Sequence, residues 1–234
     1  MPFLYRWSKS IQSALLGPAC VLCHAPAPLT QDICADCKAE LPWLQAACQH
    51  CALALSELAA DRVCPDCRKR PLADRAIAAL HYRPPADWLV TRLKFGARMP
   101  HARLLGDLLA ERISAVDSPR PDWLVPVPLH PSNLRKRGFN QAERIARRLA
   151  EPLAVPIAVG GIERRLATER QSTLAASARR ANVRNAFACD RDLGDAHVAI
   201  VDDVVTTGHT ARALAACLRH AGARRVDLYA VARA

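Results

Sequence analysis

The chain has 234 residues, 51% of them apolar, which is enough to bury a proper core, and no apolar run approaches the roughly 18 residues of a membrane helix. Its formal charge of +11 favours anionic partners such as phosphates, nucleic acid or a membrane surface. Residues 1–20 lack the apolar stretch of about 7–15 residues of a secretory signal. We therefore expect a short amphipathic helix there and a cytoplasmic protein without a membrane span.

Eight of the ten cysteines lie within the first 67 residues, as four Cys-x-x-Cys pairs. Two such pairs supply four thiolates to one tetrahedral ion, so the pattern predicts two structural Zn²⁺ sites in a zinc-ribbon domain over residues 1–72. Spacing is compatible both with sequential pairing and with a crossed arrangement, first pair with third and second with fourth. His24 and His50 adjoin the pairs and are alternative ligands. The predicted ligands are Cys20, Cys23, Cys34, Cys37, Cys48, Cys51, Cys64 and Cys67.

Residues 73–234 alternate apolar strand patterns with helical ones, which predicts an α/β domain with a parallel sheet flanked by helices. A polar, arginine-rich stretch over residues 160–184 shows no sustained period, and its length favours a functional loop. Expected strands are 75–83, 121–129, 154–159, 197–201 and 224–233. Expected helices are 139–153, 209–222 and two pieces within 86–113, parted near residues 96–100.

The most informative stretch is VAIVDDVVTTGHTA, residues 198–211. A buried strand would carry Asp202 and Asp203 to the carboxyl end of the sheet, where open α/β folds bind ligands. The following turn opens a helix, and its backbone N–H groups, hydroxyls and Gly208 suit a phosphate. The motif contains no basic partner for the two carboxylates, so they suit sugar hydroxyls or hydrated Mg²⁺. The stretch thus matches a 5-phosphorylated ribose.

A basic excess supports an anionic ligand. The segment from Arg135 to Arg184 has twelve Lys or Arg and only four Asp or Glu. The alternative is a solvated basic face, with Asn140 and Gln141 exposed at a basic helix start. The chain has neither the GxxxxGK[ST] nor the GxGxxG phosphate motif.

Residues 198–210 resemble the 5-phosphoribosyl-1-pyrophosphate (PRPP) binding motif of type I phosphoribosyltransferases. Residues 93–98, 126–146 and 171–187, together with the paired zinc ribbons, resemble the ComF family, named for competence proteins. The resemblance covers nearly the whole chain. It implies a phosphoribosyltransferase-like domain over residues 73–234, Mg²⁺ bound with PRPP, and a flexible loop that closes over the site.

The same resemblance implies roles for individual residues. Asp202 and Asp203, the candidate catalytic pair, would hold the ribose hydroxyls, and the turn would hold the 5-phosphate. The implied PRPP-binding residues are Asp202, Asp203, Val204, Val205, Thr206, Thr207, Gly208, His209 and Thr210. Those implied for pyrophosphate and the flexible loop are Pro128, Leu129, His130, Arg135, Lys136, Arg137, Gln171, Arg179 and Arg180.

The resemblance implies three functions between which the sequence does not decide. The first is a phosphoribosyltransferase in DNA uptake or utilisation, whose acceptor base the sequence does not identify. The second is a non-catalytic protein that binds single-stranded DNA beside a relict phosphoribosyl pocket. The third is an adaptor whose ribbons dock a helicase or uptake protein. Fold does not decide among them, because binding PRPP or a phosphoribosylated nucleotide does not prove transfer.

Overall fold

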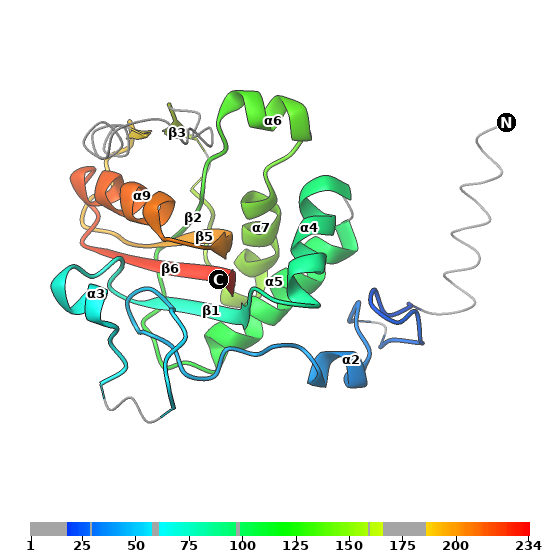
Figure 1. The fold of residues 1–234 in the computed structure, drawn as a ribbon. Coiled ribbons are helices and arrows are strands. Elements are labelled where there is room, and N and C mark those ends of the chain that lie inside the picture. The colour runs from blue at the N-terminus through cyan, green and yellow to red at the C-terminus, as the bar shows by residue number, and fades with distance from the viewer. Residues whose placement is uncertain (1–17, 29, 58–60, 97–98, 159, 166–185) are drawn as a thin grey trace, which may run out of the picture.

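A four-stranded parallel sheet forms the centre of the protein (Figure 1). The structure is a computed structural model that describes residues 18–28, 30–57, 61–96, 99–158, 160–165 and 186–234. The strand order is β1-β6-β5-β2, so β5 and β6, nearly fully buried along their length, occupy the middle. The strands are β1 (Ala76–His81), β2 (Trp123–Pro126), β5 (His197–Val205) and β6 (Arg225–Arg233).

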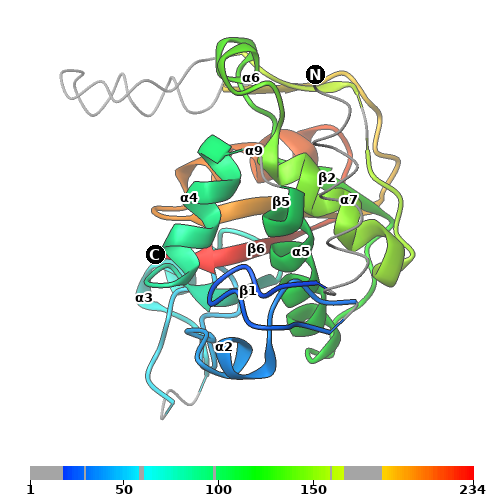
Figure 2. The ribbon, with the colours of Figure 1, turned by 90° about the vertical axis from the view of Figure 1, so that its right-hand side faces the viewer.

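Helices cover both faces of this sheet (Figures 1 and 2). On one face α9 contacts β5 and β6, while on the other α5 and α7 contact the strands and α4 packs on α5. Alternate residues of each strand enter the two cores: Ile200 joins the core under α9, and Ala199 the core under the other helices. These helices are α4 (Ala86–Gly96), α5 (Met99–Ser114), α7 (Gln141–Leu153) and α9 (His209–His220).

The zinc ribbons pack against opposite faces of the sheet. Cys20 and Ile33 of the first ribbon are buried in the core that contains α4 and α5. All four cysteines of the second ribbon are buried in the core that contains α9. The expected domain boundary after residue 72 stays a prediction. Short helices accompany the ribbons and the β2–α7 connection: α2 (Ala35–Ala39), α3 (Pro65–Lys69) and α6 (Pro131–Arg137).

Most of the expected elements that lie in the described ranges form, and three differ. The expected amphipathic helix within residues 1–20 lies almost entirely outside the described residues. The expected strand 154–159 is wrong among its described residues, since only an isolated bridge joins Ile157 to Leu124 of β2. Pro156 lacks the N–H that a regular ladder needs, although its carbonyl accepts from the N–H of Leu124. The expected loop 160–184 begins with a strand, β3 (Ile162–Arg164), paired antiparallel with β4 (Phe187–Cys189). Strand β5 continues beyond residue 201 to Val205, because the sheet buries the acidic pair.

Within the described ranges, no helix is both long and apolar enough to cross a membrane.

Candidate functional site

The eight paired cysteines form two groups of four: Cys20, Cys23, Cys34 and Cys37, then Cys48, Cys51, Cys64 and Cys67. In each group the ligand atoms lie within 4.8 Å of one another. The structure therefore selects sequential pairing over the crossed arrangement. His50 is not drawn into either group, because its Nδ1 lies 3.0 Å from the carbonyl oxygen of Ala73.

Both groups fit zinc by donor type and size. A tetrahedral ion with Zn–S bonds of about 2.3 Å holds its sulfur atoms roughly 3.8 Å apart. The Sγ atoms of Cys23 and Cys34 are 3.6 Å apart, and those of Cys51 and Cys64 are 3.7 Å apart. Four thiolates leave no open coordination position, so these are structural zinc-ribbon sites.

Asp202 and Asp203 lie at the carboxyl end of β5, and both are buried. The Asp203 backbone N–H donates to Oδ1 of Asp202 over 2.9 Å, and the Val204 N–H donates to Oδ1 of Asp203 over 2.9 Å. Burial raises the pKa of Asp202 well above its usual value, and the neighbouring charge of Asp203 raises it further. The pair therefore favours a ligand that brings positive charge or hydroxyl donors.

Lys94, near the end of α4, is the basic partner that the motif itself lacks. Its Nζ lies 2.9 Å from Oδ2 of Asp203, and the Asp203 side chain is only 4% exposed. That oxygen makes no regular hydrogen bond within the described parts of the chain, so the ion pair compensates its charge. The sequence contains one signal for Lys94, its place in the family-like stretch 93–98, but nothing there connects it to β5.

Arg164 of β3 is a second cation that the sequence reasoning missed. Burial lowers its pKa, and the charge of Asp202 partly offsets this effect. Its guanidinium lies over the ring of Phe187 in β4, 5.5 Å from the ring centre. Arg164 thus adds positive charge to the surroundings of Asp202.

The turn after β5 contains the residues expected to bind the 5-phosphate, and that role stays a prediction. Thr206 and Thr207 are exposed, and Oγ1 of Thr207 lies 3.0 Å from Nδ1 of His209. Gly208 precedes α9 with a φ of 75°, in the left-handed region that favours glycine. Thr210 in the first turn of α9 is half-buried. The N–H groups of this helix start are available to a phosphate.

The loop after β2 and helix α6 contain the residues expected to bind pyrophosphate, and these residues differ in exposure. Pro128, Leu129 and His130 are half-buried, and Nδ1 of His130 caps α6 by accepting from the Ser132 N–H over 3.3 Å. Among the basic residues, Arg135 and Lys136 are exposed on α6.

Arg137 is held more firmly than its two neighbours. It donates to the side chain of Gln141 over 2.5 Å and lies over the ring of Phe95, 5.7 Å from the ring centre. Asn140 caps α7 and donates to the carbonyl of Val127, while Gln141 is buried. The alternative of a solvated Asn140 and Gln141 is therefore wrong.

The expected flexible-loop residues Gln171, Arg179 and Arg180 lie outside the described residues.

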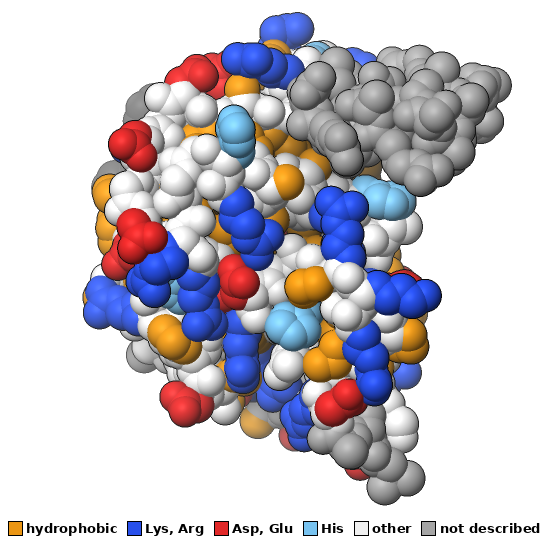
Figure 3. All heavy atoms as spheres, turned by 90° about the vertical axis from the view of Figure 1, so that its left-hand side faces the viewer, with side chains coloured by type: hydrophobic (Ala, Val, Ile, Leu, Met, Phe, Trp, Pro, Cys, Tyr) orange, Lys and Arg blue, Asp and Glu red, His pale blue; other side chains and the backbone are white. Residues whose placement is uncertain are grey.

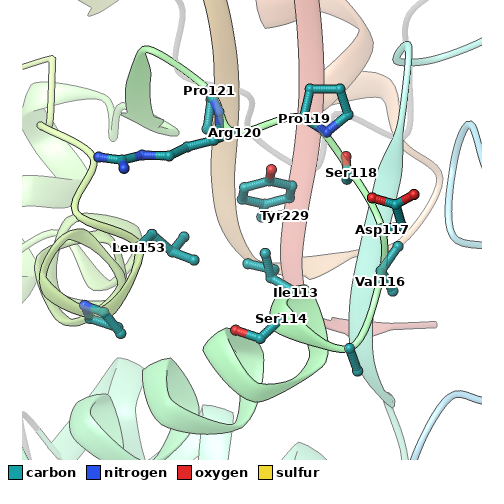
Figure 4. Close-up of a pocket in the computed structure, with 12 residues that line it drawn as sticks. Ile113, Ser114, Val116, Asp117, Ser118, Pro119, Arg120, Pro121, Leu153 and Tyr229 are labelled. Atoms are coloured by element: carbon teal, nitrogen blue, oxygen red, sulfur yellow. The ribbon is translucent and has the colours of Figure 1, made fainter.

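A separate cavity of about 490 Å³ lies away from this site (Figure 4). Its wall includes residues 114–121, which connect α5 to the start of β2. The cavity therefore lies at the amino-terminal edge of the sheet. The Tyr229 ring points into it. Ligands of open α/β folds bind at the opposite edge.

Comparisons with known proteins match both the paired zinc ribbons and the sheet domain. Residues 11–68 match the double zinc ribbon domain, and residues 102–234 match the phosphoribosyl transferase domain. DNA utilization protein YhgH of Salmonella typhi is 35% identical over 175 residues, which cover 73% of this chain and 77% of the relative. Competence protein F of Haemophilus influenzae is 32% identical over 181 residues, which cover 73% and 78%.

Among solved structures, the glutamine phosphoribosylpyrophosphate amidotransferase of B. subtilis aligns with a TM-score of 0.41 and 21% identity. The alignment covers 59% of this chain and 30% of that one, so this chain spans less than a third of that protein's length.

Replacing Asp202 with asparagine should change how stability depends on pH. An acid whose pKa is raised on folding binds its proton more tightly in the folded state, so the wild type loses stability as pH rises above about 3.8. The asparagine side chain cannot ionise, so the free energy of unfolding of Asp202→Asn should rise relative to wild type across that window. Urea denaturation at several pH values measures this difference.

Asp74→Asn is the matched control of opposite sign. Partial burial alone would raise the pKa of Asp74, but the Val226 N–H and Arg219 hold it below its usual value. The wild type therefore loses this contribution as pH falls, and Asp74→Asn should differ from wild type most at neutral pH. Parallel pH profiles for Asp202→Asn and wild type would contradict the assignment of a raised pKa.

Replacing Lys94 with methionine should remove the charge that compensates Asp203. We expect the free energy of unfolding to fall by about 2–4 kcal/mol, because a nearly buried carboxylate is left unpaired. The control is Lys38→Met. Lys38 is 28% exposed against 24% for Lys94, but its partner Glu111 is 53% exposed. The free energy of unfolding of Lys38→Met should fall by less than about 1 kcal/mol. If Lys94→Met loses no more than this control, Lys94 is dispensable to the acid pair.

Proposed function

Because the chain belongs to the ComF family, together with DNA utilization protein YhgH and competence protein F, we propose that it binds PRPP with Mg²⁺ and acts in DNA utilisation or uptake. The observation that carries the proposal is the buried Asp202–Asp203 pair, separated by two residues from the exposed Thr206 and Thr207 and the glycine turn that opens α9. One element thus supplies acceptors for a diol and donors for a phosphate, separated by only a few residues.

Each part of PRPP has a candidate partner in this chain. The carboxylates accept hydrogen bonds from the ribose hydroxyls, and the backbone N–H groups from Thr206 to Thr210 donate to the 5-phosphate. Arg135 and Lys136, exposed on α6, are the cations available to the pyrophosphate. Bound Mg²⁺ would supply charge stabilisation to the pyrophosphate oxygens.

The proposed reaction is transfer of the phosphoribosyl group from PRPP to a nitrogen nucleophile. The bond between the anomeric carbon and pyrophosphate breaks, and a bond from that carbon to the acceptor forms. Here the chain's residues orient the sugar and stabilise the departing negative charge, which requires no covalent enzyme intermediate.

The alternative, a non-catalytic single-stranded-DNA-binding protein, has less support. Proteins that bind single strands without sequence preference use a continuous positive groove lined by aromatic rings. On the face shown in Figure 3, Lys and Arg side chains are interspersed with acidic, apolar and other polar ones. Among the described residues, the exposed aromatic side chains are Trp88 and Phe95, both on α4, so they do not line a groove across several elements.

Calorimetric titration of the full chain with PRPP, with and without Mg²⁺, tests the proposal. We expect Mg²⁺-dependent binding, at least about tenfold weaker in Asp202→Asn and Asp203→Asn, because each replaces a carboxyl oxygen that can accept from a ribose hydroxyl with an amide nitrogen that cannot. Asp195→Asn is the control, since Asp195 is 79% exposed and asparagine tolerates its left-handed backbone.

Two outcomes would overturn this assignment: no binding at millimolar PRPP, or unchanged affinity in both acid variants. Where PRPP binds, pyrophosphate release in the presence of individual nucleobases tests for transfer.

A further inference from the structure

The second zinc ribbon is joined by one arginine to the turn before α9, residues 205–208, which is called the phosphate turn after its proposed ligand. Arg233, at the end of β6, donates from Nε to the carbonyl of Cys51 over 3.1 Å. Its terminal nitrogen donates to the carbonyls of Val205, over 3.2 Å, and Thr206. One guanidinium thus joins the backbone of a zinc knuckle to the first residues of the turn.

The segment that leaves this ribbon touches the turn at two further points. Leu72 packs so closely on Gly208 that a Cβ added to the glycine would lie 2.4 Å from Cδ1 of Leu72. Arg212, in the first turn of α9, donates to the carbonyls of Arg70 over 3.0 Å and Pro71 over 3.2 Å. Residues 70–72 follow directly after α3, which contains the zinc ligand Cys67. The turn and the helix start are therefore supported from the ribbon side.

The first ribbon has no such connection among the described contacts. It forms two ion pairs with α5: Asp32 with Arg103, at distances of 3.0 and 2.8 Å, and Lys38 with Glu111, at 2.7 Å. Both lie on the opposite face of the sheet from α9.

We infer that Arg233 and Leu72 are positioning residues through which the second zinc site holds the phosphate turn in its binding shape. The inference rests on the proposed function, because it concerns the turn assigned to the 5-phosphate. Zinc supplies folding free energy to its own knuckles, and these contacts extend that order to residues 205–208. Zinc and phosphate binding are therefore coupled.

Coupling between two binding sites is reciprocal. If the second zinc site improves phosphate binding, then a phosphate ligand must raise the zinc affinity of that site by the same factor. At an unchanged rate of zinc association, the higher affinity is measured as slower zinc release. The first site should not respond. This asymmetry separates coupling from a general stabilisation of the fold, which would slow zinc loss from both sites.

The first experiment measures zinc release from the full chain to an excess of a chromogenic chelator, with and without PRPP or ribose 5-phosphate. A Cys37→Ser variant, which lacks one ligand of the first site, identifies the release phase of the second site. We expect either ligand to slow that phase about fivefold or more and to leave the other unchanged. Equal slowing of both phases, or of neither, would overturn the inference.

The second experiment measures ribose 5-phosphate affinity in Arg233→Ala, Leu72→Ala and the control Arg103→Ala. Arg103→Ala removes one of the two ion pairs between the first ribbon and α5 and should bind like wild type. We expect Arg233→Ala and Leu72→Ala to bind ribose 5-phosphate about tenfold more weakly than wild type. In both variants the ligand should also slow zinc release from the second site less than it does in wild type. Wild-type affinity for ribose 5-phosphate in both variants would overturn the inference. If a variant does not fold, the zinc-release experiment on the wild type tests the inference instead.

The two proposals fail differently. If the wild type binds neither PRPP nor ribose 5-phosphate, the proposed function fails and the coupling fails with it. If the wild type binds PRPP but the second zinc site does not respond, only the coupling fails.

Discussion

Two carboxylates buried side by side at the end of β5 are the constraint on which this site depends. Burial raises the pKa of Asp202, and the neighbouring charge of Asp203 raises it further. Two features reduce the cost of burying these acids. Lys94 pairs with Asp203, and Asp202 favours its protonated form because it is buried and lies next to the charge of Asp203. Apolar residues at these positions would stabilise a parallel strand better. Charges retained against such a penalty are typical of functional sites.

The two zinc ribbons have similar ligand sets but different surroundings. The first is buried against the face that contains α4 and α5, and the second against the face that contains α9. Among the described contacts, it is the second ribbon that reaches the turn before α9, through Arg233 and Leu72. Small ribbons cannot build a sufficient core without metal, so each ribbon needs both zinc and a surface of the larger domain.

Local patterns predicted much of this structure. Cysteine spacing predicted the four-cysteine groups, and apolar periodicity predicted β1, β5, β6 and the helices around them. The patterns failed where tertiary contacts decide. Residues 154–158 are apolar like a strand, yet Pro156 interrupts the ladder, and Asp203 stays within β5 because Lys94 compensates it. Arg233 gives no local signal, since its partners Cys51 and Val205 lie 182 and 28 residues away in the chain.

The supporting residues bear on whether the pocket is a relict. A sequence motif identifies the class of ligand, but it contains neither Lys94 nor Arg233, which hold its two ends from separate elements. In a pocket without a ligand, an apolar replacement of the buried acids would be neutral or stabilising. Such a pocket would also need neither the lysine nor the arginine that contact it. Here the acids, their lysine partner and the arginine behind the turn are present together, which favours a site that still binds its ligand.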